Sequence, residues 1–173
     1  LLSGSLLLAV GLGSLHAYSV LLAPLEAELG TSRMMTGLAY SLAIVALTGA
    51  VLASPKLLAW LGPAGVARVV GLGGAVGLAL AAVGGSGLGL LLGFGCLYGF
   101  ANGLGYALFL NRAAAAMPGR TGLAIGVATA AYGLGAVLFS LVLDAAAREM
   151  SGRQALILLG GVVLAAGGLG AII

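Results

Sequence analysis

Few side chains in this sequence can do chemistry, and most of those lie inside long apolar stretches. The single histidine, His16, can donate or accept hydrogen bonds and titrates near neutral pH. Asn102 stands between Tyr98 and Tyr106 at four-residue steps, and Tyr132 lies in a later apolar stretch. A polar side chain surrounded by apolar residues is energetically costly unless it finds a partner or a wet cavity. We therefore predict that these five residues bind a small-molecule substrate.

Smaller residues share helical faces with these candidates. At about 100° per residue, Ser5, Gly13, His16 and Ser19 fall within an arc of about 120° on one helix. Similar stripes of small and polar residues recur in three further segments. We predict that a cavity is lined by Ser5, Gly13, Ser19, Ser41, Thr48, Thr129 and Ser140.

Each candidate also has a structural interpretation. His16 would be equally satisfied by a hydrogen bond to a neighbouring helix, and Asn102 by joining two helices. Tyrosines such as Tyr98, Tyr106 and Tyr132 are also common at membrane interfaces. The residue types alone leave both interpretations open.

The composition indicates which elements must position these side chains. Hydrophobic residues make up 62% of the 173 residues and charged residues only 6%, which is far from the balance of a soluble domain. Glycine, at 32 residues, is abundant where membrane helices pack closely. The sequence therefore predicts an all-α, polytopic membrane protein with the whole chain, 1–173, as one transmembrane bundle.

Breaks in hydropathy divide the chain into six predicted spans, each about long enough to cross 30 Å of hydrocarbon. They lie near residues 3–23, 35–59, 66–83, 88–110, 121–143 and 154–173. One side holds four basic residues, Lys56, Arg68, Arg112 and Arg120, against three on the other, and the positive-inside rule then places both ends in the cytoplasm. We expect a multi-pass protein of the plasma membrane, such as a bacterial inner membrane.

Glycines at four-residue spacing suggest where helices meet. Gly95, Gly99 and Gly103 form a small-xxx-small ridge, which favours close helix packing. We expect that larger side chains at Gly99 and at Gly126 would disrupt packing more than the same change at Gly11.

Two stretches resemble the major facilitator superfamily, and within it the oxalate/formate antiporter and monocarboxylate transporter branches. The first is 23–33, which is similar to the outer exit of helix one in those transporters. The second runs from Gly99 to Gly135 and includes the R-x-G-L-A-x-G pattern at 120–126. One departure is Ala59, which stands where the loop between helices two and three usually carries an acid.

The resemblance implies that the chain is the amino-terminal six-helix half of a twelve-helix transporter. In that fold, helices one, two, four and five line the cavity of this half. The implied activity is alternating-access secondary transport of a small organic anion, such as a mono- or dicarboxylate, by exchange or symport. The implied partners are that solute, a proton or counter-substrate, the lipid bilayer and a carboxy-terminal six-helix half.

Other functions have weaker support. The stretch 84–87 matches the G-x-S-G of intramembrane serine proteases, but the only histidine precedes it by a long way. A passive channel or a structural membrane subunit is the stronger alternative, although no acid lies in the middle of a span. The lone Cys96 excludes an internal disulfide and a four-cysteine metal site. We expect no enzyme activity, no cofactor, no metal and no nucleic acid partner.

Overall fold

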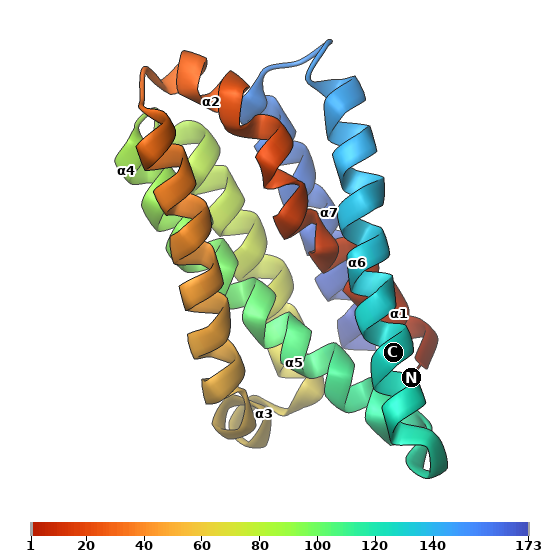
Figure 1. Ribbon diagram of the computed structural model, residues 1–173. Coiled ribbons are helices and arrows are strands. Elements are labelled where there is room, and N and C mark those ends of the chain that lie inside the picture. Colours follow the sequence, from red (N-terminus) through yellow and green to blue (C-terminus); the bar gives the residue numbers. More distant parts are fainter. Residues whose placement is uncertain (1, 173) are drawn as a thin grey trace.

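The computed structural model describes residues 2–172, and these are almost entirely helical. The helices run side by side as an elongated bundle, with short connections at its two ends (Figure 1). In chain order the elements are α1 (Leu2–Leu12), η1 (Gly13–Leu21), α2 (Leu22–Leu29), α3 (Arg33–Val83), α4 (Gly87–Leu90), η2 (Leu91–Tyr98), α5 (Gly99–Ala116), η3 (Pro118–Arg120), α6 (Thr121–Ala146) and α7 (Gly152–Ile172). The prediction of an all-α chain with several long apolar helices is confirmed.

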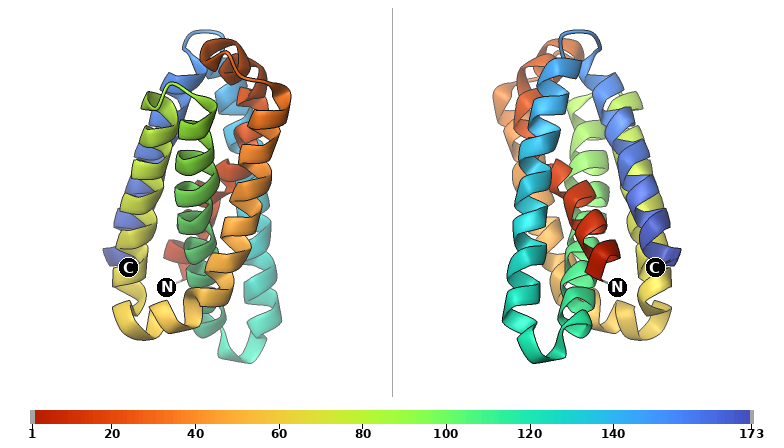
Figure 2. Two further views of the ribbon diagram at one scale, coloured as in Figure 1. Left: turned by 90° about the vertical axis from the view of Figure 1, so that its left-hand side faces the viewer. Right: turned by 90° about the vertical axis from the view of Figure 1, so that its right-hand side faces the viewer.

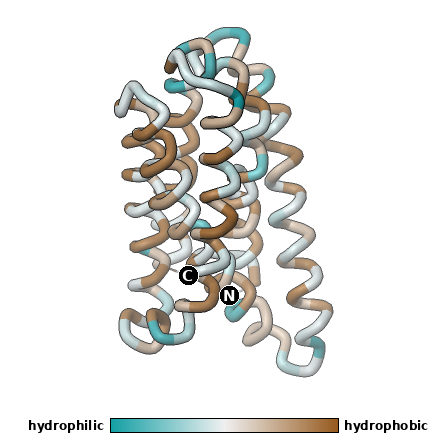
Figure 3. The backbone as a smooth tube through the Cα atoms, turned by 60° about the vertical axis from the view of Figure 1, so that its left-hand side comes forward, coloured by the Kyte–Doolittle hydropathy of each residue, from teal (hydrophilic) through white to brown (hydrophobic). Residues whose placement is uncertain are grey.

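Five helices in the described part are long and apolar enough to cross a membrane. They are Leu2–Leu29, Arg33–Val83, Gly87–Ala116, Pro118–Ala146 and Gly152–Ile172. Hydrophilic positions gather mainly at the two ends of the bundle, and hydrophobic ones lie along its length (Figure 3). This distribution is what a membrane-spanning bundle requires.

The prediction of six separate spans is wrong in its helix count, because α3 contains both the second and the third predicted span. A straight helix of its 51 residues would measure about 77 Å, more than twice the hydrocarbon thickness. Instead the chain changes direction at Gly62, whose φ of 68° and ψ of 169° lie outside the helical region. Glycine tolerates this φ without steric strain. The two halves of α3 then run in opposite directions along the bundle, with the green η2–α5 segment between them in the left view of Figure 2.

Two of the long helices depart from α geometry in their interiors. η1 is a 3₁₀ segment of nine residues, and η2 is a π-helical segment of eight residues. Runs of this length are uncommon, and such departures often mark hinges or functional sites. η2 contains Gly93 and Gly95, and Gly93 lies against the backbone of α3 at Gly77 and Ala81.

The predicted glycine ridge of the fourth span is confirmed as a packing surface. A Cβ added at Gly99 would lie 2.6 Å from the Cα of Ala43, and one at Gly103 would collide with the backbone of Leu47. The expectation for Gly126 is wrong, because a Cβ there would meet nothing within 4 Å. On α6 the close contact is instead made by Gly135, against the backbone of Val10.

The second half of α3 packs against α7. Gly71 and Gly167 face each other there. A Cβ added to either glycine would contact backbone atoms of the other. α6, by contrast, packs mainly on α1, η1 and α5. Only 17% of its most apolar 18-residue stretch is buried. α6 therefore leaves a broad apolar face exposed.

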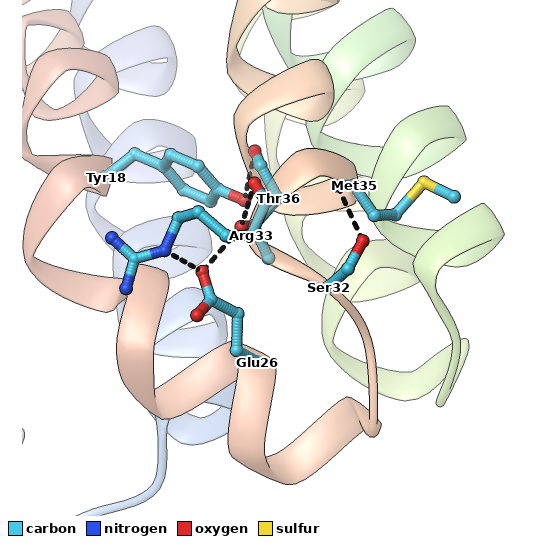
Figure 4. A network of polar contacts seen from close by, with 6 residues as sticks. All are labelled: Tyr18, Glu26, Ser32, Arg33, Met35 and Thr36. Atoms are coloured by element: carbon cyan, nitrogen blue, oxygen red, sulfur yellow. Dashed lines mark hydrogen bonds and ion pairs between the residues drawn. The ribbon is translucent and has the colours of Figure 1, made fainter.

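Polar contacts fasten the end of the bundle where α2 lies (Figure 4). Glu26 pairs with Arg33 at 2.5 Å and accepts a hydrogen bond from the Thr36 hydroxyl at 2.8 Å. Tyr18 donates to the backbone carbonyl of Thr36, and Ser32 caps the start of α3 by accepting from the Met35 N–H. These contacts tie η1, α2 and α3 together.

The neighbouring carboxylate, Glu28, performs a similar role for α7. Its two oxygens accept hydrogen bonds from the N–H groups of Gly152 and Arg153. The first N–H groups of a helix have no partner within it, and negative charge there is favourable.

Candidate functional site

Four polar side chains meet in the interior of the bundle, where η1 lies beside the junction of η2 and α5. The hydroxyls of Ser14 and Tyr98 are 2.9 Å apart, and both residues are fully buried. Asn102 follows one turn after Tyr98, and Tyr132 reaches it from α6. We call Ser14, Tyr98, Asn102 and Tyr132 the polar joint.

Asn102 is completely satisfied within the polar joint. Its amide nitrogen donates to the backbone carbonyl of Leu12 at 2.8 Å and, more weakly, to the Tyr98 hydroxyl at 3.4 Å. Its amide oxygen accepts from the Tyr132 hydroxyl at 3.0 Å. The side chain has no exposed surface. In this conformation Asn102 therefore joins α1, α5 and α6 and presents nothing to a solute.

An aromatic cluster extends from the polar joint toward the surface. The ring of Tyr132 makes edge-to-face contacts with His16 and with Tyr106, at centroid distances of 5.4 Å and 5.3 Å. Phe109 completes the contact with both tyrosines. Such pairs stabilise beyond the area they bury. Three of the predicted binding residues thus belong to one cluster, with His16 and Tyr106 half-buried at its edge.

His16 also faces a cavity of about 290 Å³ between η1 and the start of α3. Its Nδ1 lies 2.7 Å from the hydroxyl of Tyr40, and the ring makes no other hydrogen bond within residues 2–172. The Nε2 of His16 is therefore available to a ligand. The cavity is lined by His16, Tyr18, Ser19, Leu22, Gly37 and Tyr40.

The residues predicted to line a cavity occupy different environments in the structure. Ser19 lines the His16 cavity, whereas Gly13 lies against the backbone of α6 at Tyr132 and Gly135, so it packs helices rather than lining a space. Ser5 is fully buried, and Ser41 is exposed.

The remaining three hydroxyls bond to their own helices. Thr48, Thr129 and Ser140 each donate to the carbonyl four residues earlier, at 2.8 to 2.9 Å. This local bond satisfies a hydroxyl without any cavity. None of these three residues belongs to the His16 cavity.

The sequence analysis missed Ser14 and Tyr40. Tyr40 lies about one helical turn after Gly37 on α3, and its hydroxyl contacts His16 on η1. Ser14 lies two residues before His16, which is off the face expected for a regular α-helix. The 3₁₀ geometry of η1 changes the angular step per residue and turns Ser14 inward as well.

Ser86, the residue of the protease-like motif, caps the start of α4. Its hydroxyl oxygen accepts a hydrogen bond from the Gly89 N–H at 3.2 Å. Within residues 2–172 no three histidine, cysteine or acidic residues lie close enough together to hold a metal ion.

The site offers neutral hydrogen-bond donors and aromatic surfaces in a small space beside a buried joint. These groups can orient a small polar solute, with His16 able to carry a proton. The likeness to major facilitator transporters rests on the sequence motifs alone and stays a prediction. No protein-family model matches this chain, and a search of curated proteins likewise found no match.

Proposed function

We propose that this protein is a secondary active transporter of a small solute, with its site at the cavity of His16 and Tyr40. The observation that carries the proposal is a small cavity whose largely apolar wall includes His16, Ser19 and Tyr40, close to a buried polar joint. Polar groups at such a depth are rare without a functional reason.

The irregular helices support this location. η1 carries Ser14 and His16, and η2 ends at Tyr98, so both departures from α geometry border the same polar cluster. Within membranes, broken or irregular helices are tolerated where they are buried in protein or line a cavity, and transporters commonly build their sites from them.

The proposed substrate is a small organic anion, such as a mono- or dicarboxylate. A cavity of about 290 Å³ is at the small end of the range for ligand sites, which suits a solute of a few heavy atoms. The Nε2 of His16 and the hydroxyl of Ser19 are suitable donors to a carboxylate. The likeness to the oxalate/formate and monocarboxylate branches favours the same substrate class.

The proposed mechanism is alternating access in a plasma membrane, with a second six-helix bundle as partner. No basic residue lines the His16 cavity, so we propose that the partner bundle supplies the cation that attracts the anion. The broad exposed face of α6 is compatible with such a partner and equally with lipid.

A passive channel or structural subunit is the alternative, and transport kinetics separate these classes. The full-length protein would be reconstituted in liposomes and tested for uptake of radiolabelled oxalate, formate and lactate. A carrier gives saturable uptake that is accelerated by the same anion on the opposite side. Uptake that rises linearly with concentration would favour a channel, and uptake no faster than in protein-free liposomes would contradict transport of these anions.

A further inference from the structure

Arg112 is a buried cation that pairs with no carboxylate within residues 2–172. Its side chain lies near the end of α5, and the residue is only 9% exposed. Among the described residues its one hydrogen bond runs from a guanidinium nitrogen to the backbone carbonyl of Gly170, at 2.5 Å. A guanidinium has five N–H donors, and burying it without a counter-charge is energetically costly.

All four acidic side chains lie at the other end of the bundle from Arg112. Glu26 and Glu28 lie on α2, and Asp144 and Glu149 lie near the link between α6 and α7 (Figure 1). The ion pairs among the described residues join Arg33 to Glu26 and Arg148 to Asp144. Around Arg112 the other charged residues are cations, Lys56, Arg68 and Arg120, and all three are exposed.

Arg112 lines a cavity of about 610 Å³ at this end of the bundle. Residues from α3, α5 and α7 form its walls, and only Asn111 and Arg112 among them are polar. The lining residues are Leu58, Pro63, Ala64, Leu108, Asn111, Arg112, Ala115, Ala171 and Ile172. The cavity therefore combines one cation with an apolar surface.

We propose that this cavity binds the phosphate group of an anionic phospholipid, with Arg112 as its ligand and the apolar walls against the lipid's glycerol and upper acyl carbons. A guanidinium binds phosphate oxygens through two parallel N–H bonds, which are stronger than neutral hydrogen bonds. Basic pockets between membrane helices are known binding places for acidic headgroups. The site is separate from the His16 cavity, and no residue lines both.

Lipid binding by the full chain tests the proposal without any transport measurement. The protein in mild detergent would be titrated with phosphatidylglycerol, with phosphatidylcholine and with inorganic phosphate, and bound ligand would be counted by native mass spectrometry. Arg112→Gln removes the charge but keeps a donor for Gly170. Arg120→Gln is the matched control, because it removes an exposed cation at the same end. Ala115→Glu introduces a carboxylate on the cavity wall, three residues from Arg112.

We expect wild type and Arg120→Gln to bind phosphatidylglycerol about five- to tenfold more tightly than phosphatidylcholine. Arg112→Gln and Ala115→Glu should lose this preference while unfolding at the wild-type temperature in phosphatidylcholine. If Arg112→Gln does not fold, Ala115→Glu decides, because it leaves Arg112 in place. A preference that persists in a folded Arg112→Gln or in Ala115→Glu overturns the proposal. Saturation by inorganic phosphate alone, with no added preference for the lipid, overturns the lipid assignment.

Discussion

At the scale of single residues, the pair His16 and Tyr40 connects two helices at the mouth of a cavity. The 2.7 Å contact between Nδ1 and the phenol orients the imidazole, and both rings line the same cavity as Ser19. A histidine held in this way can bind an anion directly through its second ring nitrogen.

Replacing His16 by glutamine should weaken anion uptake and reduce its dependence on pH. Loss of one hydrogen bond corresponds to about 0.5 to 1.5 kcal/mol, or a several-fold rise in half-saturation concentration. Tyr40→Phe should raise half-saturation by a smaller factor, because it only releases the ring. Uptake by proteoliposomes between pH 5 and 8 measures both effects. Ser41→Ala, at an exposed neighbouring position, is the control. Wild-type uptake kinetics in both His16→Gln and Tyr40→Phe would show that His16 is not part of the binding site.

Asn102 has a different role, and its removal should affect stability first. Asn102→Ala removes the hydrogen bonds to the Leu12 carbonyl and the Tyr132 hydroxyl, whereas the Tyr98 hydroxyl keeps its contact with Ser14. Unsatisfied buried polar groups are each unfavourable by about 1 to 3 kcal/mol, so the thermal unfolding temperature in detergent should fall clearly. Thr129→Ala, which removes an exposed hydroxyl bonded within its own helix, should leave it almost unchanged. Equal unfolding temperatures for Asn102→Ala and Thr129→Ala would contradict the structural role of Asn102 in the polar joint.

Much of this residue-scale arrangement could be predicted from the sequence. His16, Tyr98, Asn102, Tyr106 and Tyr132 do fall into one contiguous cluster, because polar side chains in apolar helices seek one another. Whether each contacts solute or protein could not be predicted. That distinction depends on exposure, which differs between Asn102 and His16 although both are polar residues within apolar spans.

At the scale of elements, close helix contacts depend on which face of each helix carries its glycines. Gly99 lies directly on α3 at Ala43, whereas Gly126 on α6 faces open space. The spacing of glycines on the fourth span predicted its packing face correctly. On the fifth span several glycines compete, and their spacing does not reveal that Gly135 makes the contact.

Gly99→Ala should therefore destabilise the protein, and Gly126→Ala should not. The added methyl at Gly99 would lie 2.6 Å from Ala43, so α5 and α3 must separate. Overpacking of this kind is unfavourable by about 1 to 3 kcal/mol. Gly126→Ala adds a methyl in open space and also favours the helix, by up to about 1 kcal/mol. Thermal unfolding in detergent measures both, and a lower unfolding temperature for Gly126→Ala than for Gly99→Ala would contradict the packing.

The irregular segments η1 and η2 could not be predicted, because residues 13–21 and 91–98 are as apolar as regular helix. Their geometry follows from tertiary contacts that the local sequence does not contain. The hydropathy breaks did locate the turn at Gly62 and predicted a helix on each side of it, but not that both helices extend right up to this residue.

At the scale of the whole molecule, the two ends of the bundle differ in chemistry. One end holds all four acids and is fastened by ion pairs and helix caps. The other holds exposed cations and the Arg112 cavity. We propose that the end with the unpaired cations faces the cytoplasm, as the positive-inside rule predicts.

The central claim is that a small anion occupies the His16 cavity during transport. A single cysteine at Ser19, in a Cys96→Ala background, would report on this cavity directly, because Ser19 lines it and Cys96 does not. Proteoliposomes would be labelled with a membrane-impermeant maleimide, with and without each anion that the protein takes up. Glu149→Cys, exposed in the link between α6 and α7, serves as the control.

We expect a transported anion to change the labelling rate of Ser19→Cys several-fold and to leave that of Glu149→Cys unchanged. The change would follow from direct shielding by the anion or from closure of the cavity around it. Identical labelling rates at Ser19→Cys with and without every anion taken up would contradict the assignment of the site.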